Sequence, residues 1–158
     1  MAANGLMYTA KAQSVTVTNA AQNLFEFIAA AGTSLLIHSI RIEFVPTITS
    51  GVAQDVRAAI AIQTISTTGT GGSAVTPIAE HPRNTVAAVT TVNMLVTTPG
   101  TLGVVKSASN PSIIVPFERI FTPDQRIPVT GGGRLAINLA AGLGGSVTMS
   151  AEIYFEEL

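Results

Sequence analysis

Hydrophobic and polar residues alternate with a period of two along three segments of the chain, residues 36–44, 56–63 and 147–156. A β-strand points successive side chains to opposite faces, whereas a helix would place its apolar residues at steps of three and four. The alternation therefore predicts three strands that are each buried on one face. In the first strand, the face expected to be buried carries Leu36, His38, Ile40, Ile42 and Phe44.

Further segments have a weaker strand signal: residues 14–18, 24–29, 86–97, 112–115 and 134–140. The segment at residues 86–97 is the least regular, because its Ala87-Ala88 pair would tolerate a helix. Val and Thr dominate it, however, and their branched Cβ atoms favour a strand. Glycines and prolines between the segments predict turns. About eight short strands without a helix predict an all-β fold, an antiparallel two-sheet sandwich of jelly-roll type, with an up-and-down barrel as the alternative.

The length of 158 residues suits one domain with one hydrophobic core. We expect a flexible N-terminal arm at residues 1–7, which would become ordered only on a neighbouring subunit, and a single β-sandwich domain at residues 8–158. The polar, glycine-rich stretch at residues 66–79 is long for a hairpin connection. We expect it to form a projecting loop.

Charged residues are scarce, since 8 Lys and Arg and 9 Asp and Glu make up only 11% of the chain, where about a quarter is usual. A surface covered by Thr, Ser, Gly and Ala suits a subunit packed among other subunits better than a free enzyme. The few basic residues are scattered, so no nucleic-acid partner is expected. Charged and polar residues interrupt the most apolar stretch, residues 24–42, so no membrane partner is expected.

No pattern of residues in the chain is typical of an enzyme. The absence of Cys excludes disulfides and thiolate metal sites. His38 and His81 have no metal-ligand spacing, and His38 on its apolar strand is expected to be a hydrogen-bonded core or interface residue. Gly131-Gly132-Gly133 precedes an alternating segment, which favours a tight turn over a phosphate-binding loop. We therefore predict no catalytic residue, no cofactor and no metal.

Residues 117–126 combine four charges with two aromatic rings. We interpret the segment as an intersubunit or loop-anchoring contact, in which its two arginines bond carboxylates or carbonyls; a solvated loop is the alternative. Two tyrosines elsewhere are expected to be buried at an interface. The candidate intersubunit contacts are therefore Tyr8, Phe117, Glu118, Arg119, Phe121, Asp124, Arg126 and Tyr154.

Short motifs spread over most of the chain are Tyr8-Thr9-Ala10-Lys11-Ala12, Leu24-Phe25-Glu26-Phe27, Pro123-Asp124-Gln125-Arg126-Ile127, Gly132-Gly133-Arg134-Leu135 and Ile153-Tyr154-Phe155-Glu156-Glu157. In these motifs the chain resembles small structural proteins of tailed bacteriophages. The resemblance implies a jelly-roll decoration or cement protein, made in the host cytoplasm, that sits on the capsid surface of the virion. Such a protein would form a homotrimer and clamp the major capsid protein. The alternative is a trimeric receptor- or glycan-binding module of a tail fibre or spike, with residues 66–79 at its tip.

Overall fold

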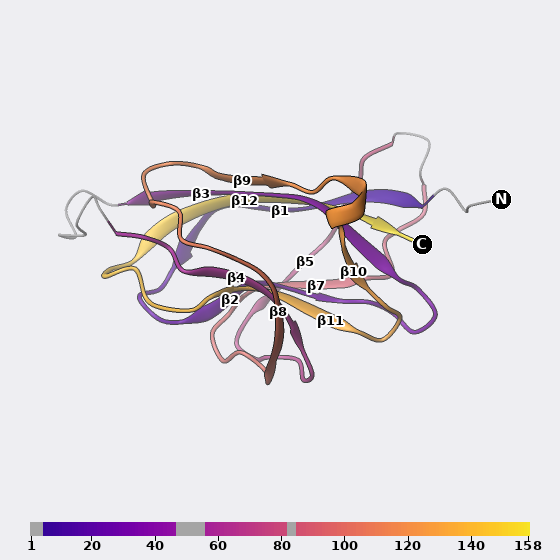
Figure 1. Cartoon of the computed structure of the whole chain (residues 1–158), viewed down its shortest axis with the longest axis horizontal. Helices are drawn as coiled ribbons and strands as arrows, with labels where there is room; N and C mark the ends of the chain where they lie inside the picture. Colours follow the sequence, from indigo (N-terminus) through magenta and orange to yellow (C-terminus); the bar gives the residue numbers. More distant parts are fainter. Residues whose placement is uncertain (1–4, 47–55, 82–84) are drawn as a thin grey trace.

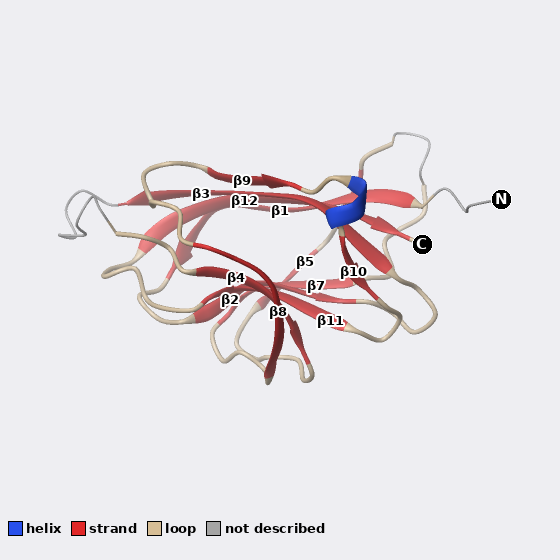
Figure 2. Cartoon of the chain, in the orientation of Figure 1, coloured by secondary structure: helices blue, strands red, loops and turns tan. Residues whose placement is uncertain are grey.

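The computed structural model describes residues 5–46, 56–81 and 85–158, which form two antiparallel sheets stacked face to face (Figures 1 and 2). The first sheet contains β1 (Leu6–Val17), β3 (Leu35–Pro46), β6 (Ile78–Ala79), β9 (Phe117–Ile120), β10 (Ile127–Val129) and β12 (Val147–Glu157). The second sheet contains β2 (Gln22–Ile28), β4 (Ile60–Ile65), β5 (Ser73–Val75), β7 (Thr91–Val96), β8 (Leu102–Ser109) and β11 (Arg134–Leu139). A short 3-10 helix, η2 (Pro123–Gln125), lies between β9 and β10.

The order of the strands is that of a jelly roll. The first sheet has the order β10-β3-β12-β1-β6, with β9 also paired to β3, and the second has the order β5-β7-β2-β11-β4-β8. The first strand therefore pairs with the last in one sheet, and the second pairs with the penultimate in the other, as in two nested Greek keys. β5, β6 and β7 form an insertion between β4 and β8. The predicted all-β, antiparallel two-sheet sandwich is confirmed.

The predicted alternation is confirmed in β12, where every second side chain is buried. In β3 the buried face differs from the prediction, because the register against β12 shifts between Tyr154 and Phe155. The shift leaves His38 as an extra residue of β3, opposite no residue of β12. A β-bulge of this kind moves the following side chains to the opposite faces. The buried residues of β3 are thus Leu35 and Ile37 before the bulge, and Ile40, Ile42 and Phe44 after it.

Other predicted strands have different bounds or are absent, since the strand predicted at residues 14–18 belongs to the longer β1 and that at residues 56–63 begins only at Ile60. The described residues contain twelve strands in place of about eight. Residues 112–115 form a turn, in which Ser112 makes only an isolated bridge to Arg57. Of residues 86–97, only Thr91–Val96 is a strand, because the chain crosses from the first sheet to the second before Thr91. The pattern missed β8, since none of its side chains is fully buried and no alternation marks it.

The predicted N-terminal arm is too long, because β1 begins at Leu6 and both Leu6 and Met7 pair with the end of β12. Residues 1–4 lie outside the described part of the chain. The predicted loop at residues 66–79 contains β5 and β6, and Thr70 within it makes a bridge to Thr98. This segment is therefore held by pairing to β1, β7 and the residues after β7.

Aromatic rings join the two sheets in the core. Phe155 on β12 stacks on Tyr8 of β1 with their ring centroids 5.7 Å apart, and it meets Phe27 of β2 edge to face at 5.5 Å. All three rings are fully buried. Each such pair contributes about 1 kcal/mol beyond the area it buries. With the core filled in this way, the outer faces and the edges of the sandwich remain as its binding surfaces.

Candidate intersubunit surfaces

The segment at residues 117–126 forms one edge of the first sheet, where β9 pairs with β3 and η2 follows it. Phe121 lies between β9 and η2, and its N–H donates to the carbonyl oxygen of His38 at 2.9 Å. The Phe121 ring is only 5% exposed and packs in the core cluster. It is therefore not available to a second subunit, contrary to the prediction.

Arg119 links this edge of the first sheet to the edge of the second. Its guanidinium carbon lies 5.2 Å from the centre of the Phe121 ring, which is a cation–π geometry. Its Nη1 also donates a hydrogen bond to the hydroxyl of Ser107 on β8. The partners of Arg119 are therefore a ring and a hydroxyl, where carboxylates or carbonyls were expected. The hydrogen bond links β8 and β9, which are edge strands of the two different sheets.

The two candidate tyrosines have different environments. Tyr8 is fully buried, and its hydroxyl donates to the carbonyl oxygen of Val86 at 3.0 Å. Tyr8 therefore belongs to the core of its own chain, and the prediction of an intersubunit role is wrong for it. Tyr154 is half-buried on the outer face of the first sheet, opposite Ser39. It stays a candidate contact.

The remaining candidates lie along the same edge with different exposures. Phe117 is half-buried and packs against the core cluster. Glu118 is exposed, and Asp124 is exposed in the first turn of η2. Arg126 is half-buried, and its Nε is buried with no hydrogen-bond partner. Of these four side chains, the two carboxylates are the most accessible to another molecule.

Large hydrophobic side chains are exposed on two edge strands and on the connection between them. They lie on β8, on the connection that follows it and on β9, and we call them the apolar edge: Leu102, Val104, Val105, Ile114, Val115 and Ile120. Ile120 is the most exposed of them, at 71%. Sequence reasoning missed the apolar edge because no local pattern shows which apolar residues the fold leaves exposed.

β8 itself is an open strand. It pairs with β4 on one side and is the last strand of the second sheet, so no described strand pairs with its other side. None of its eight side chains is fully buried, although Leu102, Val104 and Val105 are large and apolar. Unpaired backbone groups beside apolar side chains form a template for another chain, and Lys106 is the single charged residue on this strand. β8 is therefore suited to contact a second protein.

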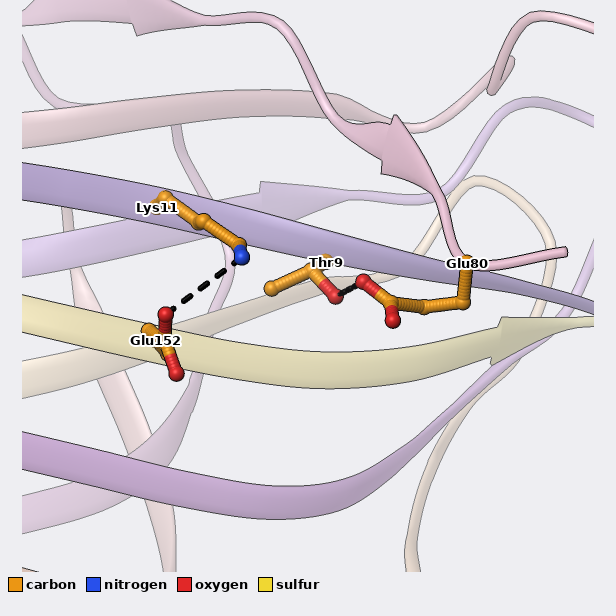
Figure 3. Close-up of polar contacts among 4 residues, drawn as sticks. All are labelled: Thr9, Lys11, Glu80 and Glu152. Atoms are coloured by element: carbon orange, nitrogen blue, oxygen red, sulfur yellow. Dashed lines mark hydrogen bonds and ion pairs between the residues drawn. The ribbon is translucent and has the colours of Figure 1, made fainter. Parts of the chain in front are cut away.

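The outer face of the first sheet has a shallow hollow of about 420 Å³, lined by Lys11, Gln13, Arg41, Glu43, Ser150 and Glu152. In it the Lys11 Nζ lies 3.4 Å from Glu152 Oε1 (Figure 3). The hydrogen bond to the Glu152 carboxylate raises the pKa of the Lys11 ammonium above its ordinary value. Beside this pair, the Thr9 hydroxyl donates to the carboxylate of Glu80, which follows β6 (Figure 3). Oppositely charged side chains thus gather on a chain that has few charges.

A buried carboxylate was not singled out from the sequence. Glu26 on β2 is fully buried, and it alternates with two core phenylalanines, so it points away from the core. Its Oε1 accepts from Asn23 Nδ2 at 2.6 Å, and its Oε2 accepts from the N–H of Gly69 at 3.1 Å. Asn138 Nδ2 in turn donates to Asn23 Oδ1 at 2.7 Å. This network holds the connection between β4 and β5 against the outer side of the second sheet.

The described residues contain no group of three or more His, Cys, Asp or Glu side chains that could hold a metal ion. His38 is hydrogen-bonded, as predicted, with its Nε2 2.9 Å from Glu156 Oε2. The glycine run before β11 forms the predicted tight turn, in which Gly132 has a φ of +75°. Within the described parts of the chain, no helix is long and apolar enough to cross a membrane.

Comparisons with known proteins add little to this jelly-roll sandwich. No protein-family model matches the sequence, and no curated protein matches it. A crystal structure of the infectious bursal disease virus VP2 subviral particle aligns with 99% of this chain at 15% sequence identity and a TM-score of 0.16. The chain spans only 40% of that VP2 chain. A TM-score this low carries no argument about fold or function.

Proposed function

We propose that the protein is a virion structural protein, a capsid decoration or cement protein that stabilises the head shell of a phage through contacts between subunits. The apolar edge is the observation that carries this proposal. Six large hydrophobic side chains are exposed on the open strand β8, on the connection after it and on β9, in a chain of which only 11% of the residues are charged. Large exposed apolar surfaces on soluble proteins usually bind something.

The mechanism is cohesion at many equivalent contacts. The exposed half of a valine side chain contributes about 1 kcal/mol when it becomes buried. A single apolar edge is therefore a weak contact. On a shell, the same contact is repeated at every symmetry-related position, and a subunit that binds several neighbours gains avidity. Apolar edges arranged head to tail around a threefold axis would give the expected homotrimer, which clamps the major capsid protein beneath it.

The alternative, a receptor- or glycan-binding module of a tail fibre or spike, has less support. It would use residues 66–79 as an exposed tip, but Gly69 of that segment donates to buried Glu26, and Ser73–Val75 pairs with β7. Glycan sites also rely on aromatic platforms. The chain has no Trp and 2 Tyr, of which Tyr8 is buried.

Electron cryo-microscopy of capsids assembled without the protein tests the proposal. After addition of the purified protein, we expect ordered density at symmetry-related positions on the shell. The variant Val104→Lys should lose this density, because it puts a charge into the apolar edge. Val89→Lys is the matched control, since Val89 is also exposed, at 53%, but lies outside the apolar edge. Absence of ordered binding by the unmodified protein would overturn the proposal.

A further inference from the structure

Four charged residues stand side by side across the outer face of the first sheet. In the strand register, Lys11 on β1 lies opposite Glu152 on β12. Glu152 also lies opposite Arg41 on β3, and Arg41 lies opposite Glu118 on β9. We call these four residues the charged row. Their signs alternate from one strand to the next, positive, negative, positive, negative, in a chain that has only 8 basic and 9 acidic residues.

The charged row faces away from the core and is accessible. The side chains of Lys11 and Glu152 are 43% and 39% exposed, and Arg41 and Glu118 are exposed as well. Exposed ion pairs within one chain stabilise a fold by less than about 1 kcal/mol each. Folding stability is therefore a weak reason for gathering so many of the chain's charges in this row.

The row has four members of alternating sign. When its order is reversed, each position therefore meets a residue of opposite charge. A two-fold axis that lies between two facing sheets and runs parallel to the strands reverses the order of the row. It places Lys11 opposite Glu118 of the second copy, and Glu152 opposite Arg41 of the second copy. Each of the four positions then meets an opposite charge. A two-fold axis perpendicular to the strands would instead place like charges together.

We propose that the outer face of the first sheet binds a second copy of the chain, face to face, about a two-fold axis parallel to the strands. The positions that flank the charged row agree with this arrangement. Glu43 pairs with Ser150 within the sheet, so the same axis places the Glu43 carboxylate opposite the Ser150 hydroxyl of the second copy. It also places the Tyr154 side chain opposite Ser39 of the second copy. Neither flanking position puts two like charges together.

The shape and the size of the face suit such a contact. The hollow of about 420 Å³ beside Glu152 leaves room for the long side chain of Arg41 from the second copy. β1, β3 and β12 are about 36 Å long and the four-residue β9 is about 13 Å long, so at a spacing of about 4.8 Å they cover roughly 600 Å². Stable interfaces bury about 800 Å² on each partner. Facing sheets normally pack with their strands nearly aligned, which this axis requires. The contact needs no capsid and does not use β8. It shares β9 and Ile120 with the apolar edge, so the variants that test it change only the charged row.

Two variants that each swap one neighbouring pair test the proposal. Lys11→Glu with Glu152→Lys keeps an ion pair at these positions within the chain, but it makes all four contacts across the axis repulsive. Arg41→Glu with Glu118→Arg has the same effect from the other half of the row. We expect each double variant to self-associate about 100-fold more weakly than the unmodified protein, with half its particle mass in sedimentation equilibrium at the same concentration.

Mixing gives the decisive result. The two double variants, purified separately and combined, should associate with each other, because each half-row then meets opposite charges. The variant with all four substitutions should self-associate like the unmodified protein but should not associate with it. Raising the salt concentration should weaken every one of these complexes, because their charges are screened.

The proposal is overturned if the unmodified protein shows no self-association that these swaps weaken, or if the fully inverted variant mixes freely with it. Circular dichroism of each variant shows whether the sandwich has folded. The pairing of the two double variants is a second readout that only folded chains can give, so loss of association through misfolding is distinguished from loss of charge complementarity.

Discussion

Replacing the buried carboxylate of Glu26 by alanine should destabilise the sandwich by about 3 kcal/mol. The carboxylate accepts hydrogen bonds from Asn23 Nδ2 at 2.6 Å and from the Gly69 N–H at 3.1 Å. Loss of the acceptor leaves the buried Asn23 amide and the half-buried Gly69 N–H without this partner, at a cost of about 1.5 kcal/mol each. The emptied volume adds about 1 to 2 kcal/mol. Removal of a desolvated charge offsets part of this cost.

Substitution by glutamine separates the hydrogen bonds from the volume. Glu26→Gln keeps the shape and one acceptor, but its amide group turns a donor toward one of the two existing donors. We therefore expect a smaller loss of about 1.5 kcal/mol. Glu43→Ala is the matched control, because Glu43 is an exposed strand residue. Its effect should stay within about 0.5 kcal/mol.

Urea denaturation followed by circular dichroism measures these differences, provided that the slope of the free energy against urea is unchanged. Hydrogen exchange gives a local readout, since the Gly69 amide should lose protection in both Glu26 variants but not in Glu43→Ala. The reasoning is refuted if Glu26→Ala unfolds at the same urea concentration as the unmodified protein, or if Gly69 exchanges at an unchanged rate.

Three further predictions concern the core, a close approach and a titration. Phe155→Ala should destabilise the protein by about 4 kcal/mol, because it removes the ring that joins the two sheets, and a thermal melt that shows a smaller loss than Phe155→Leu would contradict this. Gly100→Ala should cost about 2 kcal/mol in urea denaturation, because the added Cβ would overlap the carbonyl oxygen of Thr67, a backbone atom that cannot rotate away. The Lys11 ammonium should titrate above its ordinary pKa by NMR, since its hydrogen bond to Glu152 favours the charged form; its contribution is complete below the unfolded-state pKa and is lost as pH rises through the folded-state pKa. Glu152→Gln should lower that pKa, and an unchanged titration curve would contradict the assignment.

Local patterns predicted much of the secondary structure. β12 was predicted because one of its faces meets the core, and burial of one face imposes a period of two. β8 could not be predicted in this way, because none of its side chains is fully buried and its sequence carries no such pattern. The phase of β3 was predicted wrongly around His38, since a bulge depends on the register of the partner strand.

The candidate surface residues, like the strands, could be predicted only in part. The segment at residues 117–126 was recognised by its charges and rings, but exposure alone separates Glu118, which is accessible, from Phe121, which is buried. Nothing local in the sequence marks Tyr8 as a core residue. Its burial depends on stacking against Phe155, a residue far away along the chain.

The sequence by itself therefore determined the all-β class, the antiparallel two-sheet sandwich and a surface poor in charge, because these depend on composition and on the side-chain period. Tertiary structure alone decided which exposed residues lie together. The apolar edge combines residues from two strands and the connection between them. The charged row combines residues from four strands, and their alignment follows from cross-strand register. Register is set by packing between distant segments, so no local pattern can encode where Lys11, Glu152, Arg41 and Glu118 meet.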